Sequence, residues 1–384
     1  MKLSHLFTDF FENEKTSGLV LICCTIVSLI VANSAAGAGY LHFWHTPMGG
    51  ESLEYWINDG LMTIFFLLVG LELEREIYLG ELSNFREALL PIFGALGGMI
   101  VPAGIFLFFN YGLPSQSGAG IPMATDIAFA LAVLSLLGNR VPTSLKVFLT
   151  ALAVIDDLGA IIVIAIFYTN DLSVMNLTIA LGVFAVLLVM NRLKVRNLIP
   201  YLIGGVIMWW FMLHSGVHAT ITGVLLAFAI PFGNGDEKST SYILQDVLHK
   251  PVAFIILPLF ALANTAILIS GSLGETLSQP YSIGIGLGLV LGKPIGILLL
   301  TFLACTFGIC KLPSDFGWKS ILGVGALGGI GFTMSIFITL LAFNDQETIA
   351  HAKLVILLSS LLAGILGYVI LKFVLTKEIK ETDE

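Results

Sequence analysis

Two adjacent aspartates, Asp156 and Asp157, lie inside an apolar run that extends from residue 148 to residue 167. Each ionised carboxylate at the centre of a bilayer costs about 3 kcal/mol on insertion scales, so an adjacent pair is expected beside water, a cation or a counter-charge. Because consecutive helical residues point about 100° apart, the two carboxylates cannot face one ligand equally and are expected to differ in role. The pair indicates an ion path, and a purely structural polar network is the alternative.

Lys293 is the obvious counter-charge for this pair, because it lies near the middle of another apolar run, residues 283 to 307. It is about ten residues, or about 15 Å at helical rise, from either end of that run. That distance disfavours snorkelling of its ammonium group to the membrane surface. Burial disfavours a charged lysine and a neighbouring carboxylate favours it, so an Asp–Lys pair can switch protonation near physiological pH. The sequence leaves open which member titrates.

Asp126 follows Thr125 at the end of a glycine- and proline-rich stretch, residues 118 to 126, and a second such stretch spans residues 323 to 335. In transporters, interrupted segments at corresponding places in two halves mark the binding site, and their free carbonyls supply the oxygen ligands that hard cations prefer. Alternatively, Asp126 offsets the positive N-terminal ends of interrupted helices. For the glycines themselves, the alternative to interruption is close helix packing.

The elements that position these residues follow from composition. The chain is 57% hydrophobic and 11% charged, whereas a soluble domain carries about 25% charged residues. A transmembrane helix needs about 20 mainly apolar residues. The sequence therefore predicts an all-α polytopic membrane protein, with spans near residues 15–33, 56–80, 88–110, 121–138, 143–168, 174–191, 198–212, 216–231, 243–265, 283–307, 320–343 and 350–375. A membrane β-barrel is excluded because the apolar runs are too long and continuous for its strands.

The basic residues support this partition. Of the 18 Lys and Arg residues, all but Lys293 and Lys353 fall at alternate connections. The positive-inside rule then places both termini in the cytoplasm. It also makes the third to fifth spans and the tenth to twelfth spans two inverted three-helix groups. The net charge of −8 has no basic patch against it that would indicate nucleic-acid binding.

Several further residues carry two interpretations each. Glu72 and Glu76 share a helix face with Arg75 nearby, as in a solvated helix end with local ion pairs or in an acidic funnel that attracts cations. His218 is a packed or interfacial histidine more often than a pH switch. Aromatic residues around Gly49 and Gly50 predict a short hairpin or an interfacial anchor. We expect free thiols without metal-type spacing at four cysteines, namely Cys23, Cys24, Cys305 and Cys310.

Together these motifs resemble the NhaA-type bacterial sodium/proton antiporters over nearly all of the chain. The motifs that carry the resemblance are Asp156-Asp157 within residues 153–161, Thr125-Asp126 within residues 124–131, Lys293 within residues 292–294, and the stretches 58–59, 65–72, 215–220 and 329–337. Members of this family are built from inverted repeats with broken helices.

The resemblance implies twelve helices, two inverted three-helix repeats and crossed interrupted helices 4 and 11. Residues 88–168 and 283–375 would be the core repeats. Residues 1–87, with a periplasmic hairpin, and residues 169–282 would form the interface part of a homodimer, and residues 376–384 a cytoplasmic tail.

Individual roles follow in the same way. Sodium and protons would bind at Asp157 and Asp156, supported by Thr125 and Asp126, with Lys293 as the partner of Asp156. The pH response and the cytoplasmic entrance would involve Glu72, Arg75, Glu76, His218 and Asp246. Gln245 stands where the family's best-known member has a glutamate implicated in pH sensing, and Asp246 is one step away. The pH activation profile is therefore not transferable.

The expected function is electrogenic export of sodium or lithium in exchange for protons across the bacterial inner membrane, by alternating access, without a cofactor and without enzymatic activity. The alternatives are another cation/proton exchanger, a sodium-coupled organic anion transporter, and an intramembrane protease that uses Asp126 with Asp156 or Asp157. None of the aspartates in the protease alternative lies in a Gly-x-Gly-Asp signature, and this alternative gives Lys293 no hydrolytic role.

Overall fold

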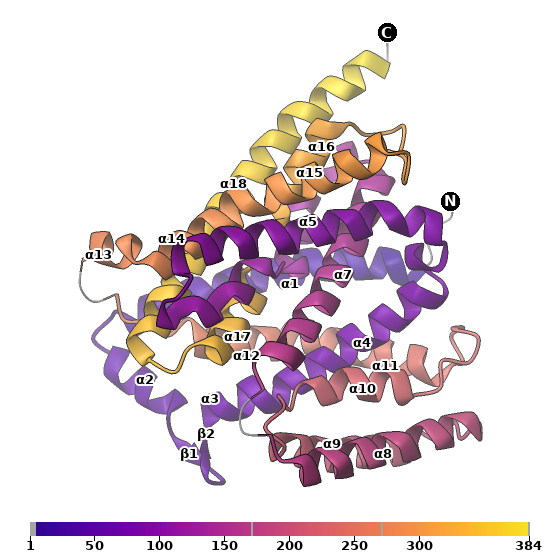
Figure 1. The fold of residues 1–384 in the computed structure, drawn as a ribbon, viewed down its shortest axis with the longest axis vertical. Coiled ribbons are helices and arrows are strands. Elements are labelled where there is room, and N and C mark those ends of the chain that lie inside the picture. Colours follow the sequence, from indigo (N-terminus) through magenta and orange to yellow (C-terminus); the bar gives the residue numbers. More distant parts are fainter. Residues whose placement is uncertain (1–4, 170–171, 270–271, 383–384) are drawn as a thin grey trace. The chain divides into compact units, whose positions relative to one another are not determined.

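The computed structural model describes residues 5–169, 172–269 and 272–382, and these residues are almost entirely helical (Figure 1). The strands found in them are β1 (Pro47–Met48) and β2 (Glu51–Ser52), which pair antiparallel with Pro47 opposite Ser52. Gly49 and Gly50 connect them with φ of 68° and 105°, a conformation that glycine adopts without strain. The hairpin interpretation is therefore confirmed.

Helices of membrane-spanning length dominate the described residues. Seven are long and apolar enough to cross a bilayer: Leu53–Tyr78, Phe85–Asn110, Thr143–Phe167, Val174–Arg192, Thr240–Asn264, Pro280–Thr306 and Gln346–Leu375. Three broken pairs raise this number to as many as ten: Thr16–Ala32 with Gly37–Trp44, Pro114–Met123 with Ile127–Ser135, and Trp318–Gly328 with Phe332–Ala342. The all-α polytopic class is confirmed, whereas the count of twelve spans stays a prediction.

Two of the breaks fall in the glycine-rich stretches for which the sequence predicts interruption. The chain bends by 40° between η3, a 3-10 helix (Pro114–Met123), and α6 (Ile127–Ser135). It bends by 49° between α16 (Trp318–Gly328) and α17 (Phe332–Ala342). The predicted interruptions are therefore confirmed at both places.

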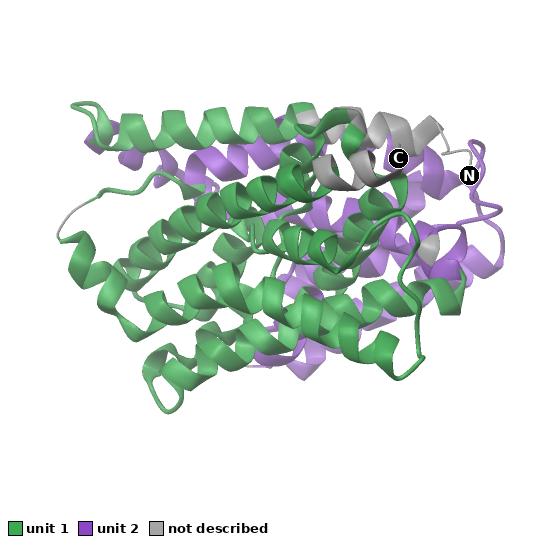
Figure 2. Cartoon of the chain, turned by 90° about the horizontal axis from the view of Figure 1, so that it is seen from above, with its two compact units in different colours: residues 1–37, 84–160, 264–384 green, residues 38–83, 161–263 purple. Residues whose placement is uncertain are grey.

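The chain forms two compact units, coloured separately in Figure 2. Unit 1 comprises residues 1–37, 84–160 and 264–384, and unit 2 comprises residues 38–83 and 161–263. Unit 1 contains η3, α6, α16 and α17. It also contains α1 (His5–Ala32), α5 (Phe85–Asn110), η4 (Gly138–Arg140), most of α7 (Thr143–Phe167), α13 (Leu273–Ser278), α14 (Pro280–Leu287), η6 (Gly288–Gly292), α15 (Lys293–Thr306) and α18 (Gln346–Thr382). The division into repeats and interface parts stays a prediction, and the last two residues of the expected tail lie outside the described residues.

Close backbone contact joins α5 to α15 within unit 1. A Cβ atom added at Gly97 would lie 2.0 Å from the carbonyl oxygen of Gly296, and one added at Gly296 would lie 2.1 Å from that of Gly97. On the other side of α15, a Cβ at Gly325 of α16 would lie 2.9 Å from Cα of Pro294. Small residues thus bring the helix that begins at Lys293 against its neighbours, so both interpretations of the glycines, interruption and packing, apply.

Unit 2 contains the hairpin and a second set of helices. Its elements are α2 (Gly37–Trp44), α3 (Leu53–Tyr55), η1 (Trp56–Leu61), α4 (Met62–Tyr78), η2 (Glu81–Ser83), α8 (Val174–Arg192), α9 (Ile199–Leu213), α10 (Ile221–Ala229), α11 (Thr240–Pro251), η5 (Val252–Ile256) and α12 (Leu257–Asn264). Of these, α4 packs on α10 through Gly70 and Gly223, and a Cβ at Gly223 would lie 2.2 Å from the carbonyl oxygen of Thr63.

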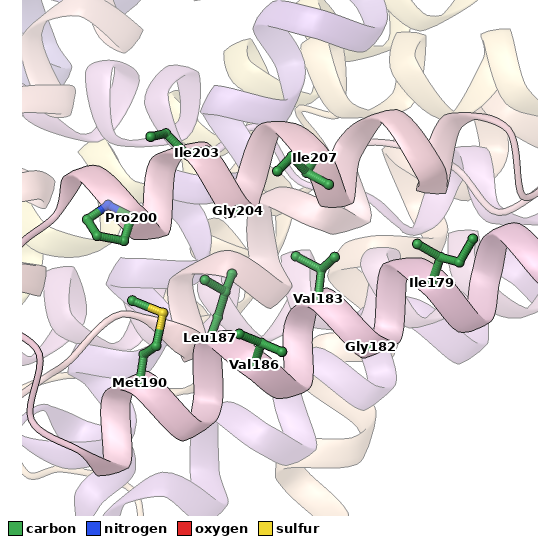
Figure 3. A pocket seen from close by; sticks show the side chains of 10 residues that line it. All are labelled: Ile179, Gly182, Val183, Val186, Leu187, Met190, Pro200, Ile203, Gly204 and Ile207. Carbon is green, nitrogen blue, oxygen red and sulfur yellow. The ribbon is translucent and has the colours of Figure 1, made fainter.

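An open groove lies along the packed helices α8 and α9 in unit 2 (Figure 3). Its lining consists of Ile179, Gly182, Val183, Val186, Leu187, Met190, Pro200, Ile203, Gly204 and Ile207. All of these residues are apolar, so the groove offers no side-chain oxygen or charge to an ion.

Candidate cation and proton site

The two helix breaks of unit 1 satisfy each other's backbone groups. The amide of Asp126, in the first break, donates to the carbonyl oxygen of Ile330, in the second, at 2.6 Å. In the other direction, Ser335 Oγ of α17 donates to the carbonyl oxygen of Ile121, in the last turn of η3, at 2.7 Å. Broken helices expose backbone groups that need partners in a membrane, and here each break supplies partners to the other.

Asp126 connects the N-terminal ends of two helices. Its Oδ1 accepts from the amide of Phe129 at 3.1 Å and thereby caps its own helix, α6. Its Oδ2 accepts from both the amide and the hydroxyl of Thr333 on α17, at 3.0 and 2.6 Å. Both carboxylate oxygens are thus engaged by helix N-termini, where a negative charge is stabilising. Of the two roles expected for Asp126, the geometry favours the offset of helix dipoles.

Asp156, Lys293 and Thr125 form a closed triangle. Asp156 on α7 is 1% exposed and Lys293, the first residue of α15, is fully buried. Lys293 Nζ lies 2.5 Å from Asp156 Oδ2 and 2.7 Å from Thr125 Oγ1, and Thr125 Oγ1 lies 2.7 Å from the same Asp156 oxygen. The structure therefore brings together the counter-charge pair that the sequence predicts, with Thr125 between its members.

Thr125 has one hydroxyl proton and two acceptors for it. Besides Asp156 Oδ2, the carbonyl oxygen of Gly328 lies 2.9 Å from Thr125 Oγ1. Lys293 can only donate, so it occupies a lone pair of the hydroxyl, which then donates to either Asp156 or Gly328. The hydroxyl proton can therefore go to either of two acceptors, and this choice changes how many hydrogen-bond donors Asp156 has.

The second oxygen of Asp156 is buried without a hydrogen-bond donor among the described residues. Asp157, the next residue on α7, is itself 3% exposed. A buried carboxylate oxygen that lacks a donor is costly unless a proton or a cation satisfies it. Carboxylate, hydroxyl and carbonyl oxygens are the ligands that hard cations prefer. The chemistry of these groups therefore suits a hard cation.

A wide turn that the sequence does not reveal precedes Lys293. Residues Gly288–Gly292 form a single π-helical turn, η6, between α14 and α15. Pro294 has no amide hydrogen to donate within a helix, and π-turns are frequent at functional sites. The Gly292-Lys293-Pro294 triplet is the local signal that could have suggested an irregular helix here.

The candidates for a pH response lie in unit 2. Glu72 Oε1 on α4 is 3.9 Å from Nδ1 of His249 on α11, and the guanidinium group of Arg75 lies over the ring of Tyr242, 5.4 Å from its centroid. Glu76 also belongs to α4. The sequence alone does not identify His249 as a partner of Glu72, because the pairing depends on how α11 packs on α4.

A second histidine pair lies near the hairpin. His218 Nε2 is 3.4 Å from Asp59 Oδ1, in the π-turn η1, and Nδ1 is 2.9 Å from Thr220 Oγ1. His218 is therefore packed and also paired with a carboxylate. Asp246, by contrast, is exposed on α11, whereas Gln245 beside it is half-buried.

All four cysteines are free thiols, as the sequence predicts. Cys305 and Cys310 are nevertheless close, with their Sγ atoms 3.4 Å apart at the end of α15. Gly308, with φ of 73°, reverses the chain between them. The spacing of five residues gives no hint of this contact, because it depends on the turn at the helix end.

Comparison with known proteins extends these observations to the whole chain. The model of the family described as Na+/H+ antiporter 1 matches residues 8–371. Among curated relatives, the Na(+)/H(+) antiporter NhaA of Flavobacterium psychrophilum is 73% identical over 381 residues, 99% of either chain. The proteins of that name from Cytophaga hutchinsonii and Dechloromonas aromatica are each 62% identical, over 99% and 97% of this chain and 98% and 97% of their own. The chain therefore belongs to the Na+/H+ antiporter 1 family.

Proposed function

We propose that this protein exchanges sodium or lithium ions for protons across the membrane, and that both compete for the carboxylates of Asp156 and Asp157. The observation that carries the assignment is the fully buried Lys293–Asp156 pair beside two helix breaks that contact each other, with a second Asp156 oxygen that has no donor among the described residues. An ion site at the midplane between interrupted helices is the arrangement that secondary transporters use. Relatives 62–73% identical that are named Na(+)/H(+) antiporters support the same activity.

Coupling follows from charge. The buried pair already contains one ammonium group against one carboxylate, so a cation that binds at Asp156 and Asp157 adds a second positive charge in a low-dielectric site. Release of a proton from the site offsets that charge, and return of protons displaces the cation. Thr125 assists because its hydroxyl donates to Asp156 when the carboxylate is bare and turns to Gly328 when a cation or proton takes its place.

The exchange is electrogenic if two protons replace one monovalent cation. Each cycle then carries one net positive charge inward, worth about 2.3 kcal/mol per 100 mV of inside-negative potential. Alternating access would expose the site first to the cytoplasm, where sodium binds, and then to the outside, where protons displace it. The acidic side chains of α4, Glu72 and Glu76, would attract cations at the cytoplasmic end.

We also propose the membrane, the orientation and the oligomeric state in which this exchange takes place. The protein lies in the bacterial inner membrane with both termini in the cytoplasm, as the alternation of basic residues indicates. It functions as a homodimer that contacts its partner through the hairpin of β1 and β2, in a lipid bilayer. The His218–Asp59 and His249–Glu72 pairs would respond to pH, because each couples an imidazole to a carboxylate.

The test measures collapse of a preformed pH gradient in everted membrane vesicles when sodium, lithium or potassium is added. The native protein should respond to sodium and lithium. Asp157→Asn should abolish the response, because an amide oxygen cannot supply the negative charge that holds the ion. Asp236→Asn, at an exposed loop residue, is the matched control and should retain full activity.

Two results would contradict the proposal. A fully active Asp157→Asn protein would remove this residue from the site. No response to any of the three cations between about pH 6 and 9 would favour sodium-coupled uptake of an organic anion instead.

A further inference from the structure

A hydroxyl on α18 holds the second helix break in place. Ser360, 7% exposed, accepts two hydrogen bonds at Oγ, from the amides of Gly331 and Phe332, both at 3.2 Å. Phe332 is the first residue of α17. The first amides of any helix lack partners within it. At the start of α17, Ser360 accepts from the amides of Gly331 and Phe332, and Asp126 accepts from the amide of Thr333.

The segment that Ser360 holds continues directly to the ion site. It carries the carbonyl oxygen of Ile330, which accepts from the amide of Asp126, and it follows Gly328, whose carbonyl oxygen accepts from Thr125. Glycine makes this path possible, because a Cβ at position 329 would lie 2.3 Å from a backbone oxygen of η6. The break is therefore confined between α18 on one side and the Lys293 region on the other.

The position of the Gly328 carbonyl decides where the proton of Thr125 goes. That carbonyl, at 2.9 Å, competes with Asp156 Oδ2, at 2.7 Å, for the single hydroxyl proton. If the break relaxes and the carbonyl moves away, Thr125 donates to Asp156 alone. Asp156 Oδ2 then accepts from both Thr125 and Lys293 at all times. An arriving cation must displace the Thr125 hydrogen bond, which is stronger than when the hydroxyl proton is divided between Asp156 and Gly328.

We propose that Ser360 is a positioning residue of the exchanger, which sets cation affinity and the pH dependence of exchange by fixing the break between α16 and α17. It acts through the amides of Gly331 and Phe332 and touches neither ion. The inference rests on the proposed exchange at Asp156 and Asp157, and assigns to α18 a part in tuning that site.

The experiment compares Ser360→Ala with Ser359→Ala. Ser359 is the adjacent residue of α18 and is equally buried at 7%, but it lies towards Gly286 of α14, whose added Cβ would be 3.6 Å from Ser359 Oγ. Both variants lose one hydroxyl, and only Ser360→Ala leaves two helix amides without their acceptor. Ser360→Thr restores the hydroxyl and serves as the rescue variant.

Exchange in everted vesicles is measured against sodium concentration at several pH values. Ser360→Ala should raise the apparent KM for sodium about tenfold, the equivalent of about 1.4 kcal/mol, and shift the pH at which exchange is half-maximal, while the maximal rate changes less than about twofold. Ser359→Ala should match the native protein in KM and pH profile, and Ser360→Thr should return towards it.

A KM and pH profile of Ser360→Ala equal to those of Ser359→Ala would overturn the proposal. So would a fall in maximal rate and thermal stability at unchanged KM, which is the signature of a structural role alone. If Ser360→Ala does not accumulate, Ser360→Cys replaces it, because a thiol is a weaker acceptor, and a native KM in that variant would equally overturn the proposal. Failure of the exchange itself would be distinct, since the native protein and Ser359→Ala would then both lack a sodium response.

Discussion

The Asp156–Lys293 pair allows the largest quantitative prediction. Both side chains are excluded from solvent, and Nζ lies 2.5 Å from Oδ2. Removing one member of a buried ion pair leaves an uncompensated charge and costs about 3–5 kcal/mol. Replacing both members by well-packed hydrophobic residues of similar volume is often neutral or stabilising, and removing both charges together likewise leaves no uncompensated charge. Asp156→Asn and Lys293→Met should each destabilise the protein strongly, whereas the double variant should recover most of the loss.

The change in melting temperature follows from the same figures. At about 2 °C per kcal/mol for a large chain, each single substitution should lower the apparent melting temperature by about 6–10 °C. The double variant should lie within about 3 °C of the native protein, since its remaining cost is the lost hydrogen bonds of Thr125. The non-additivity defines the interaction energy of the pair, which we expect to exceed about 2 kcal/mol.

The assay is thermal unfolding of the four purified proteins in one detergent at one pH, by intrinsic fluorescence or by loss of monodisperse protein. Asp315→Asn, at an exposed residue, controls for loss of an aspartate as such. Exchange activity is recorded in parallel and should be impaired in Asp156→Asn and in the double variant, which separates stability from function. If the double variant is as unstable as the sum of the single variants, the two side chains do not form the pair described above, and the reasoning fails.

Two further predictions concern backbone space and helix capping. Gly329→Ala should lower the melting temperature and abolish exchange, because its Cβ would meet the carbonyl oxygen of Leu289 at 2.3 Å, whereas Gly104→Ala, with nothing within 4 Å of its Cβ, should be neutral or slightly stabilising. Hydrogen bonds from the hydroxyl and amide of Thr348 lower the pKa of Asp345 at the start of α18. The capping contribution of Asp345 is therefore present above the ordinary aspartate pKa and is lost as the pH falls through the lowered value. Asp345→Asn should abolish that pH dependence in thermal unfolding measured between about pH 2 and 6, and an unchanged pH dependence would contradict the assignment.

The sequence predicts the charged centre of the site because charge in a membrane is expensive. Few arrangements satisfy Asp156 and Lys293 within apolar helices, so their pairing can be expected without a structure. The same holds for the broken helices, because glycine and proline at high density weaken a helix wherever it lies. The cost of a charge in a membrane and the helix propensity of a residue are both local properties, so they can be derived from one sequence.

The supporting contacts could not be predicted in this way. Ser360 is one of many hydroxyls in apolar spans, and nothing local distinguishes it from Ser359. Its partners, Gly331 and Phe332, lie in another segment of the chain, as do the partners of Thr125 and one partner of Asp126, Thr333. These contacts depend on how two broken helices pack together, which is a property of the fold. Short helices such as α10 (Ile221–Ala229) fall below the length that marks a span, so the described residues give at most ten of the twelve expected spans by length.

The backbone contact between Gly97 and Gly296 has a consequence for how this protein can change over evolution. A side chain at either position would collide with a carbonyl oxygen, at 2.0 or 2.1 Å, and no second-site mutation can make a carbonyl smaller. At Gly159, by contrast, the obstacle is Sδ of Met99, also at 2.1 Å, and a shorter residue at position 99 would remove it. Suppressor mutations should therefore be recoverable for substitutions at Gly159 and absent for those at Gly97 or Gly296.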